Sequence, residues 1–430
     1  MGDEVLQLGA RGARDRCGAG TSEAEQRVMS AVQPPSLALP AQVLDLLRCP
    51  VTQGSLHLMD ALTLRGWNAG VETGAVRHLD GAPVRQRFAA ALATEDGSVV
   101  YGIEDGILLL LRELGMTRDG QYLALPPSPQ AATNRSVAAF YDQVGWQTVA
   151  AGHVFDDSAR YEDLRPVSRD YVRACRRRVA AHLPPHGRFL LDAASGPVQY
   201  EEYRAYSANF DFRICADISI VALRAARERL GAHGVCVLCD VGNLPLRDGS
   251  IDAFVSLHTI YHLPAQEQLT AMGELWRVLQ EDGKGVVVYT WGDDSLLMNL
   301  AAGFCFPLRT LKRMGRTLLP RALACRWQKR RSREAQTGRS GVATLTLHSH
   351  AHPYAWYRDE VQPMFHAALT CWRSLSTAVM KRLIHDRLGG KRLLAWVCGL
   401  EERYPRFFGR HGQYPMFLFH KRGEKGNCAA

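Results

Sequence analysis

The stretch RFLLDAASGPVQYEEY, residues 188–203, holds the first element that decides the fold. It opens with RFLLDA, an apolar run of the length typical of a buried strand, and passes directly into the turn ASGP at 194–197. A strand that runs into a glycine-containing turn is typical of nucleotide-binding α/β domains. Such turns usually carry two or three glycines, whereas this one keeps Gly196 alone. The stretch therefore predicts a strand end that binds a ligand and leaves the kind of ligand open.

A regular alternation of strands and helices surrounds this stretch. Apolar runs predict strands at 188–193, 213–217, 235–240, 250–258, 284–291, 369–376 and 416–422. Amphipathic patterns predict helices at 218–230 and 265–279, the second with Gly283 past its end as a stop signal. Strands that alternate with helices form a parallel sheet covered on both faces. We therefore expect a doubly wound α/β domain with a mostly parallel, seven-stranded sheet.

The chain of 430 residues is longer than one ordinary domain. Residues 1–38 are rich in Gly, Ala, Arg and Pro without periodicity, which predicts a disordered tail. The parts expected after it are a small α+β module at 39–112, a linker at 113–134, the main domain at 135–422 and a tail at 423–430. The main domain is expected to contain a basic insertion at 296–347 and a helical insertion at 379–405.

The net charge of +9 is concentrated in one segment. Residues 301–340 contain eleven Arg and Lys against one acid, Glu334, so the rest of the chain is close to neutral. Three interpretations stay open: a solvated lid, contact with a membrane surface or lipid through 309–333, and nucleic acid as the least favoured. Trp327 is the one aromatic residue within the basic run, which offers little stacking for bases.

The composition indicates a cytoplasmic globular protein. No apolar run approaches the roughly 20 residues that span a bilayer, and the first residues lack the apolar core of a secretory signal. Eleven cysteines are scattered without a disulfide framework, which suits a reducing compartment. Cys236 and Cys239 form a CxxC within a predicted strand, where side chains three apart face opposite ways, so we expect core thiols.

The predicted strands end in residues suited to binding a nucleoside. Asp192 ends the first strand, Asp217 the second and Asp240 the third, and Leu257-His258 ends the fourth. In doubly wound sheets the ligand lies beyond the carboxyl ends of the strands. A carboxylate after the second strand can accept hydrogen bonds from both ribose hydroxyls, and Asp240 suits the adenine amino group. One such aspartate is more often a helix cap, but three in consistent places favour a bound adenosine.

In the order of its motifs, this region resembles the class I S-adenosylmethionine-dependent methyltransferases. The motifs are LLDAASGP, ADIS, CDVGNLPLRDGSIDAFVSLHTIYHLP and ELWRVLQEDGKGVVVYTW. The resemblance implies a Rossmann-like fold, methyl transfer and S-adenosyl-L-methionine as cofactor. It implies these cofactor-binding residues: Tyr141, Asp192, Ala194, Gly196, Asp217, Ile218, Asp240, Val241 and Leu257. His258 and His262 would lie where the methyl group points and are the candidate catalytic residues.

The turn departs from the pattern Asp-x-Gly-x-Gly-x-Gly of this family. Ala194 and Val198 replace the first and third glycines, and Gly196 is kept. We expect the alanine to fit because the backbone there keeps a negative φ, whereas Gly196 needs its conformational freedom. A dinucleotide needs close backbone approach for its pyrophosphate, an anion that S-adenosylmethionine lacks. The missing glycines therefore count against NAD more than against a methyl donor.

The module near the start resembles a second family, the zinc-ribbon activator subunit of tRNA and protein methyltransferases. The resemblance rests on RCPVT at 48–52 and YGIEDGIL at 101–108. That family has a Cys-Pro-x-Cys, whereas here Cys49 is present and Thr52 replaces the second cysteine. Structural zinc takes four N or S ligands, so we expect the module to bind no metal.

The methyl acceptor is expected to be an O or N atom of a small molecule, lipid or glycan. Two alternatives stay open. One is an NAD-dependent oxidoreductase on a similar sheet. The other is a catalytically inactive cofactor-binding scaffold, which the lost glycines and zinc ligands make credible.

Overall fold

The computed structural model describes residues 39–118, 131–149, 154–301 and 349–423, which belong to one compact unit. The tail predicted at 1–38 and the basic segment at 309–333 lie outside the described residues.

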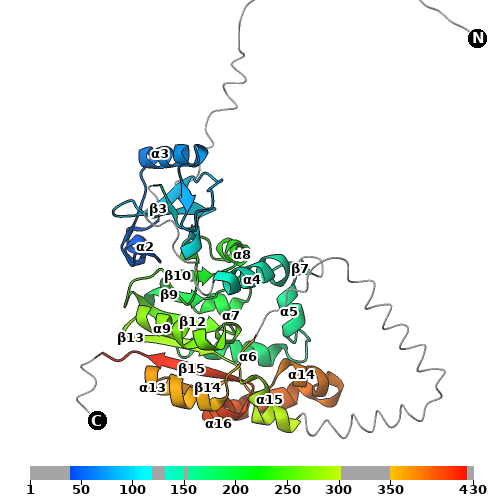
Figure 1. Cartoon of the computed structure of the whole chain (residues 1–430). Coiled ribbons are helices and arrows are strands. Elements are labelled where there is room, and N and C mark those ends of the chain that lie inside the picture. Colours follow the sequence, from blue (N-terminus) through cyan, green and yellow to red (C-terminus); the bar gives the residue numbers. More distant parts are fainter. Residues whose placement is uncertain (1–38, 119–130, 150–153, 302–348, 424–430) are drawn as a thin grey trace, which may run out of the picture. The chain divides into compact units, whose positions relative to one another are not determined.

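Seven strands of the main domain form the predicted sheet (Figure 1). They are β9 (Gly187–Ala193), β10 (Phe210–Asp217), β11 (Gly234–Leu238), β12 (Ile251–Leu257), β13 (Leu279–Val288), β14 (Ala368–Arg373) and β15 (Tyr414–His420). Their order is β11-β10-β9-β12-β13-β15-β14, and neighbours are parallel except that β15 is antiparallel to β13 and β14. The expectation of a doubly wound, mostly parallel sheet is confirmed. The chain order reverses at β9, where a ligand crevice forms in such sheets.

Helices cover both faces of this sheet. On one face, α6 (Arg169–Ala180) and α8 (Ile220–Leu230) pack against apolar residues of β9 to β12. On the other, α9 (Gln268–Val278) and α13 (Gln362–Phe365) contribute Trp276 and Phe365, whose rings contact Phe419 of β15. Successive residues of a strand point to opposite faces, so an apolar run in each strand is buried on both.

The N-terminal module continues the sheet of the main domain. It contains α2 (Ala41–Leu46), β1 (Leu56–Leu58), α3 (Ala61–Glu72), β2 (Arg77–His78), β3 (Ala90–Thr94), β4 (Val100–Glu104), β5 (Ile107–Leu109) and β6 (Met116–Thr117). β5 pairs in parallel with β11, so the sheet of the described residues has thirteen strands. An uncovered edge exposes unpaired backbone groups, and β5 supplies partners to β11. The module extends to Thr117, past the expected boundary at residue 112.

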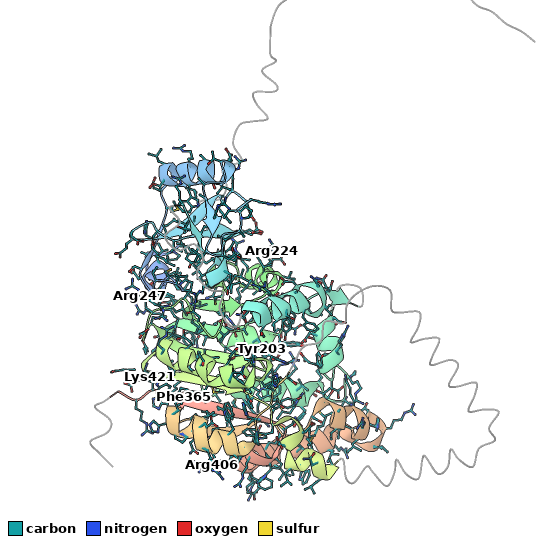
Figure 2. The ribbon with its side chains drawn as sticks, in the orientation of Figure 1. Tyr203, Arg224, Arg247, Phe365, Arg406 and Lys421 are labelled. Atoms are coloured by element: carbon teal, nitrogen blue, oxygen red, sulfur yellow. The ribbon has the colours of Figure 1, made fainter. Side chains whose placement is uncertain are left out.

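Side chains of the main domain also reach the module. The guanidinium of Arg247 donates to Ser55 Oγ at 2.8 Å, and the backbone N–H of Arg247 donates to Leu46 O. Arg224 of α8 forms ion pairs with Glu104 and Asp105; Figure 2 labels both arginines. Half-exposed ion pairs contribute little to stability, so the strand pairing is the main connection.

Further elements complete the described part of the chain. They are α4 (Ala131–Phe140), the π-helix η2 (Tyr141–Gly145), β7 (Thr148–Val149), β8 (Val154–Phe155), α5 (Asp156–Tyr161), α7 (Glu201–Ala205), α12 (Tyr354–Trp356), the π-helix η7 (Tyr357–Val361), α14 (Thr377–Leu383), α15 (Gly390–Arg403) and α16 (Pro405–His411). The 3-10 turns are η1 (Arg112–Leu114), η3 (Gly231–His233), η4 (Ile260–His262), η5 (Ala265–Glu267), η6 (Gly292–Asp294) and η8 (Asp386–Leu388). One local expectation was wrong: α9 ends at Val278 and Gly283 lies inside β13, so this glycine is no helix stop.

Candidate active site

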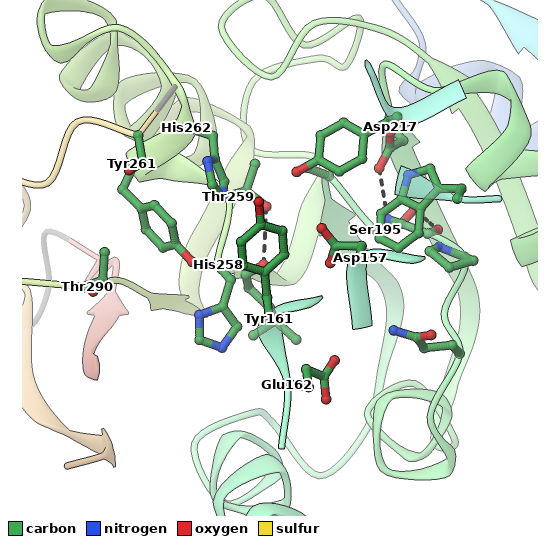
Figure 3. A pocket seen from close by; sticks show the side chains of 18 of the residues that line it. Asp157, Tyr161, Glu162, Ser195, Asp217, His258, Thr259, Tyr261, His262 and Thr290 are labelled. Carbon is green, nitrogen blue, oxygen red and sulfur yellow. Dashed lines mark hydrogen bonds between the residues drawn. The ribbon is translucent and has the colours of Figure 1, made fainter. Parts of the chain in front are cut away.

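A cavity of about 680 Å³ lies beyond the carboxyl ends of β9, β10, β11 and β12 (Figure 3). Every residue predicted to bind the cofactor or to act in catalysis lines it: Tyr141, Asp192, Ala194, Gly196, Asp217, Ile218, Asp240, Val241, Leu257, His258 and His262. The convergence follows from the topology, because the carboxyl ends of parallel strands meet at one edge of the sheet.

The turn after β9 has the backbone of a glycine-rich loop although two of its three positions lack glycine. The φ angle is +57° at Ala194, +55° at Gly196 and +49° at Val198. The expectation of a negative φ at Ala194 is therefore wrong. A positive φ costs a residue with a Cβ about 1–2 kcal/mol. Neighbouring residues hold Ala194 and Val198 at positive φ: the N–H of Ala194 donates to Ala216 O at 2.7 Å, and the Val198 side chain is buried in the core.

Asp217, the last residue of β10, connects this turn to the next strand. Its Oδ2 accepts the N–H of Gly196 and its Oδ1 accepts the N–H of Ser219, both at 2.8 Å. Burial raises the pKa of the Asp217 carboxyl to about 6, although these backbone bonds act in the opposite direction. A carboxylate has about four acceptor positions, so two remain for a ligand.

Asp192 is bound to a buried arginine. Arg213 of β10 donates from Nε to Asp192 Oδ2 at 3.1 Å and makes a second, shorter contact through Nη2. Both side chains are almost fully buried. The two charges offset each other, so Asp192 lines the cavity without adding a free negative charge.

Asp240 follows β11 and faces α4. Its Oδ2 accepts from Asn134 Nδ2 and its Oδ1 accepts the N–H of Gly242, both at 2.7 Å. Cys239 and Val241 line the cavity beside it, so the wall combines an acceptor with apolar surface. A purine with an exocyclic amino group needs this combination.

Two aromatic rings stack above the turn. The ring centroids of Tyr141 and Trp146 are 5.2 Å apart, with 15° between the planes. A Cβ on Gly196 would lie 3.2 Å from the Trp146 ring, so the glycine permits this close approach. The indole Nε1 of Trp146 is buried and has no acceptor among the described residues.

His258 and His262 lie after β12. His258 has a φ of +61°, and its ring packs edge-on against Trp372 at 4.4 Å and Tyr414 at 5.3 Å. Burial, followed by the positive charge of Arg373, lowers the pKa of His258 to about 3, so the imidazole is neutral. His262 ends η4, where its backbone N–H donates to Thr259 O at 2.8 Å. Both side chains reach the cavity, and no observation assigns either of them a catalytic step.

No motif in the sequence marks the residues on the far side of the cavity. They are Asp157, Tyr161, Glu162, Arg176, Trp372, Arg373 and Tyr414. Asp157 belongs to α5, and burial together with the charge of Glu162 raises its pKa to about 6. The segment FDDSARYEDL at 155–164 does concentrate acids and tyrosines ahead of the first strand, which is a weak signal. Arg373 reaches the cavity because β14 and β15 return to the sheet after β13.

The cavity fits S-adenosylmethionine. Asp217 and Asp240 have acceptor positions for ribose hydroxyls and an adenine amino group, and the indole N–H of Trp146 lacks an acceptor within the described ranges. A pyrophosphate would need free N–H groups at the turn, whereas the N–H of Gly196 is bound by Asp217. The donor set therefore suits a nucleoside without phosphates better than a dinucleotide.

Comparisons with known proteins match part of the chain to a methyltransferase family. Residues 191–287 match the family described as "Methyltransferase domain". No curated protein matches the chain in sequence.

Solved structures similar to this chain include a putative S-adenosyl-L-methionine-dependent methyltransferase from Methanococcus maripaludis (19% identity, 41% of this chain and 80% of that chain, TM-score 0.26). Another is the complex between the Haloferax volcanii Trm112 methyltransferase activator and the putative methyltransferase (14%, 60% and 92%, TM-score 0.35). A third is geranyl diphosphate C-methyltransferase from Streptomyces coelicolor A3(2) with Mg²⁺, geranyl diphosphate and S-adenosyl-L-homocysteine (12%, 69% and 100%, TM-score 0.38). TM-scores below 0.5 do not establish a shared fold, so the fold rests on the strand order.

Residues 191–287 are therefore similar to a methyltransferase domain, and S-adenosyl-L-methionine is the cofactor. The comparisons give no support to the resemblance of the N-terminal module to a zinc-ribbon activator. In that module, Cys49 Sγ accepts the N–H groups of Val51 and Thr52 at 3.4 and 3.3 Å.

Metal ligation and membrane spanning both lack support in the described part of the chain. Within it, no group of three or more His, Cys, Asp or Glu could hold a metal ion. None of its helices combines the length and the apolar character needed to cross a membrane.

Proposed function

We propose that this protein transfers a methyl group from S-adenosylmethionine to an O or N atom of an acceptor bound beside His258, and that it acts in the cytoplasm. The observation that carries the proposal is the convergence of Asp217, Asp240 and His258 on one cavity. When bound, the cofactor supplies a methyl group that its sulfonium already activates. The residues of the chain then have to align the acceptor, and alignment is worth up to about 7–11 kcal/mol.

At the cavity, Asp157 can take the proton that an O or N acceptor loses, and His258 can position the acceptor. Asp157, whose pKa burial raises to about 6, is mostly ionised near neutral pH and is basic enough for general base catalysis. The neutral imidazole of His258 lies against Trp372 and Tyr414 and can accept a hydrogen bond from the acceptor. We therefore assign proton transfer to Asp157 and positioning to His258. His262, which also lines the cavity, is a further candidate catalytic residue.

Cofactor binding and methyl transfer are tested separately. S-adenosylhomocysteine should raise the unfolding temperature of the full chain, whereas NAD should not. In a cell extract with tritiated S-adenosylmethionine, the protein should label one of the small-molecule, lipid, RNA or protein fractions. Stabilisation by NAD would favour the oxidoreductase, and cofactor binding without any labelled product would favour the inactive scaffold.

The basic segment supports a separate proposal, contact of residues 309–333 with an anionic lipid surface. These residues contain ten Arg and Lys and no acid. Each such charge near an anionic membrane contributes about 1 kcal/mol. The chain should cosediment with phosphatidylserine vesicles at low salt and not with phosphatidylcholine vesicles; equal binding to both would contradict the proposal.

A further inference from the structure

One buried arginine at the cavity lacks the carboxylate partner that other buried arginines have. Arg176, Arg213 and Arg373 are the buried arginines of the described residues. Arg213 is paired with Asp192, and Arg176 with Glu162 and Glu202. Arg373 is 5% exposed, and within the described part of the chain no carboxylate lies within ion-pair distance of it.

The guanidinium of Arg373 has few partners of any kind. It ends β14, and its Nη2 donates to Thr377 Oγ1 at 3.2 Å. Its Nε is buried without an acceptor among the described residues. The central carbon lies 5.0 Å from the ring centroid of Trp372 and 4.7 Å from that of Tyr414. Arginine stays protonated in proteins, so the charge of Arg373 lacks a carboxylate at ion-pair distance and its Nε–H lacks an acceptor within the described part of the chain.

A buried charge without a counterion is costly, because the interior replaces its hydration poorly. The faces of Trp372 and Tyr414 offset part of this cost through cation–π attraction. They do not supply the in-plane acceptors that a guanidinium prefers, which are the paired oxygens of a carboxylate or phosphate. An anionic ligand at this position would satisfy both the charge and the free donors.

The position of Arg373 connects this anion to the reaction. Trp372 and Tyr414 contact both the guanidinium and the ring of His258, so the arginine and the histidine share one end of the cavity. Lys381 of α14 lines the cavity as well and adds a second positive charge. The strand-end acids that fit the adenosine come from β10 and β11, across the sheet from β14.

We propose that Arg373 binds a carboxylate or phosphate group of the methyl acceptor. The substrate is then a small anionic molecule whose O or N atom is held beside His258 while Arg373 fixes its charged end. This inference rests on the proposed methyl transfer, and it narrows the acceptor to anionic molecules.

The test uses inorganic phosphate and acetate as probes on the full chain saturated with S-adenosylhomocysteine. Either anion should raise the unfolding temperature above that in chloride of equal ionic strength, and the more effective one identifies the group. Arg373→Met should raise the apparent Kd for that anion about tenfold or more, because charge-assisted hydrogen bonds are lost. Arg358→Met is the matched control, since Arg358 is exposed and paired with Asp359. It should respond like the wild type.

The unfolding temperature without anions separates a ligand-binding arginine from a structural one. Arg373→Met should unfold at or above the wild-type temperature, because an unpaired buried charge is removed. If that variant does not fold, Arg373→Lys should keep a weakened response to the anion. A wild-type response no larger than in chloride, or an undiminished response in Arg373→Met, would overturn the proposal. So would a tenfold loss of S-adenosylhomocysteine affinity in Arg373→Met, which would assign the arginine to the cofactor's carboxylate.

Failure of this inference differs from failure of the proposed function. A protein that binds S-adenosylhomocysteine but neither anion keeps its methyltransferase assignment and loses the anionic acceptor. A protein that does not bind S-adenosylhomocysteine loses both.

Discussion

The backbone N–H of Gly196 donates to Asp217 Oδ2 at 2.8 Å, and this bond joins the turn after β9 to the end of β10. The turn orients the carboxylate, and the carboxylate in turn fixes the left-handed backbone of the turn. Because Oδ1 is held by Ser219, the carboxyl plane is set before any ligand arrives. Preorganised acceptors of this kind lose little entropy on binding.

The charge of Asp217 should make stability depend on pH. Burial raises its pKa to about 6, so the folded state keeps the proton to a higher pH than the unfolded state. The stability due to protonated Asp217 is full below about pH 4 and is lost as pH rises through 6. Relative to the wild type, Asp217→Asn should therefore gain about 3 kcal/mol between pH 4 and pH 8. Urea unfolding across this range measures the difference, and a constant difference would contradict the raised pKa.

The affinity for S-adenosylhomocysteine should follow the same titration in the opposite direction. Protonation of Asp217 removes a charged acceptor for the ribose, so binding should weaken below about pH 6. Asp217→Ala should weaken binding about tenfold or more near neutral pH, because two hydrogen bonds are lost. Calorimetry at pH 5 and pH 8 checks both statements. Unchanged affinity in the variant would remove Asp217 from the site.

Gly196→Ala should disturb the site through Trp146. The new Cβ would lie 3.2 Å from the indole ring at a φ of +55°, so the ring has to shift. We expect a loss of about 1–2 kcal/mol in unfolding free energy and weaker cofactor binding. The control is Gly273→Ala in α9, where a Cβ meets nothing within 4 Å and should stabilise by up to about 1 kcal/mol. Equal effects of the two changes would refute the role of Trp146.

Ala194→Gly and Val198→Gly should act in opposite directions although both residues have positive φ. Ala194→Gly relieves backbone strain and should be neutral or stabilising by up to about 1 kcal/mol. Val198 is buried in the core, so Val198→Gly should cost about 2–3 kcal/mol in lost packing despite the relieved strain. Thermal unfolding distinguishes them, and a destabilised Ala194→Gly would show that the turn is unstrained.

The ion pair of Asp192 and Arg213 should be structural. Asp192→Asn leaves a buried guanidinium unpaired and should cost about 3–5 kcal/mol. Arg213→Met should cost a similar amount, and the double variant Asp192→Leu/Arg213→Met should recover most of the loss. Denaturant unfolding of the three variants measures the coupling. Additive losses in the double variant would argue against a coupled pair.

The positions of Asp217 and Asp240 were predictable, because parallel strands in an alternating pattern leave little freedom in where their ends meet. The backbone at Ala194 was not. Its side chain favours a negative φ, and the bond from its N–H to Ala216 O on the neighbouring strand opposes that preference. Arg373 and Asp157 were also missed, because their importance comes from burial beside residues that are distant in the sequence.

Local apolar periodicity in the sequence determined the strands, the helices and the mostly parallel character of the sheet, since each buried strand needs helices on both faces. Tertiary packing alone decided that β5 of the N-terminal module pairs with β11, and that β14 brings the buried Arg373, which has no carboxylate partner among the described residues, to His258. Pairing partners and buried charges are set by which surfaces meet across the fold, and a linear pattern of residues does not encode those meetings.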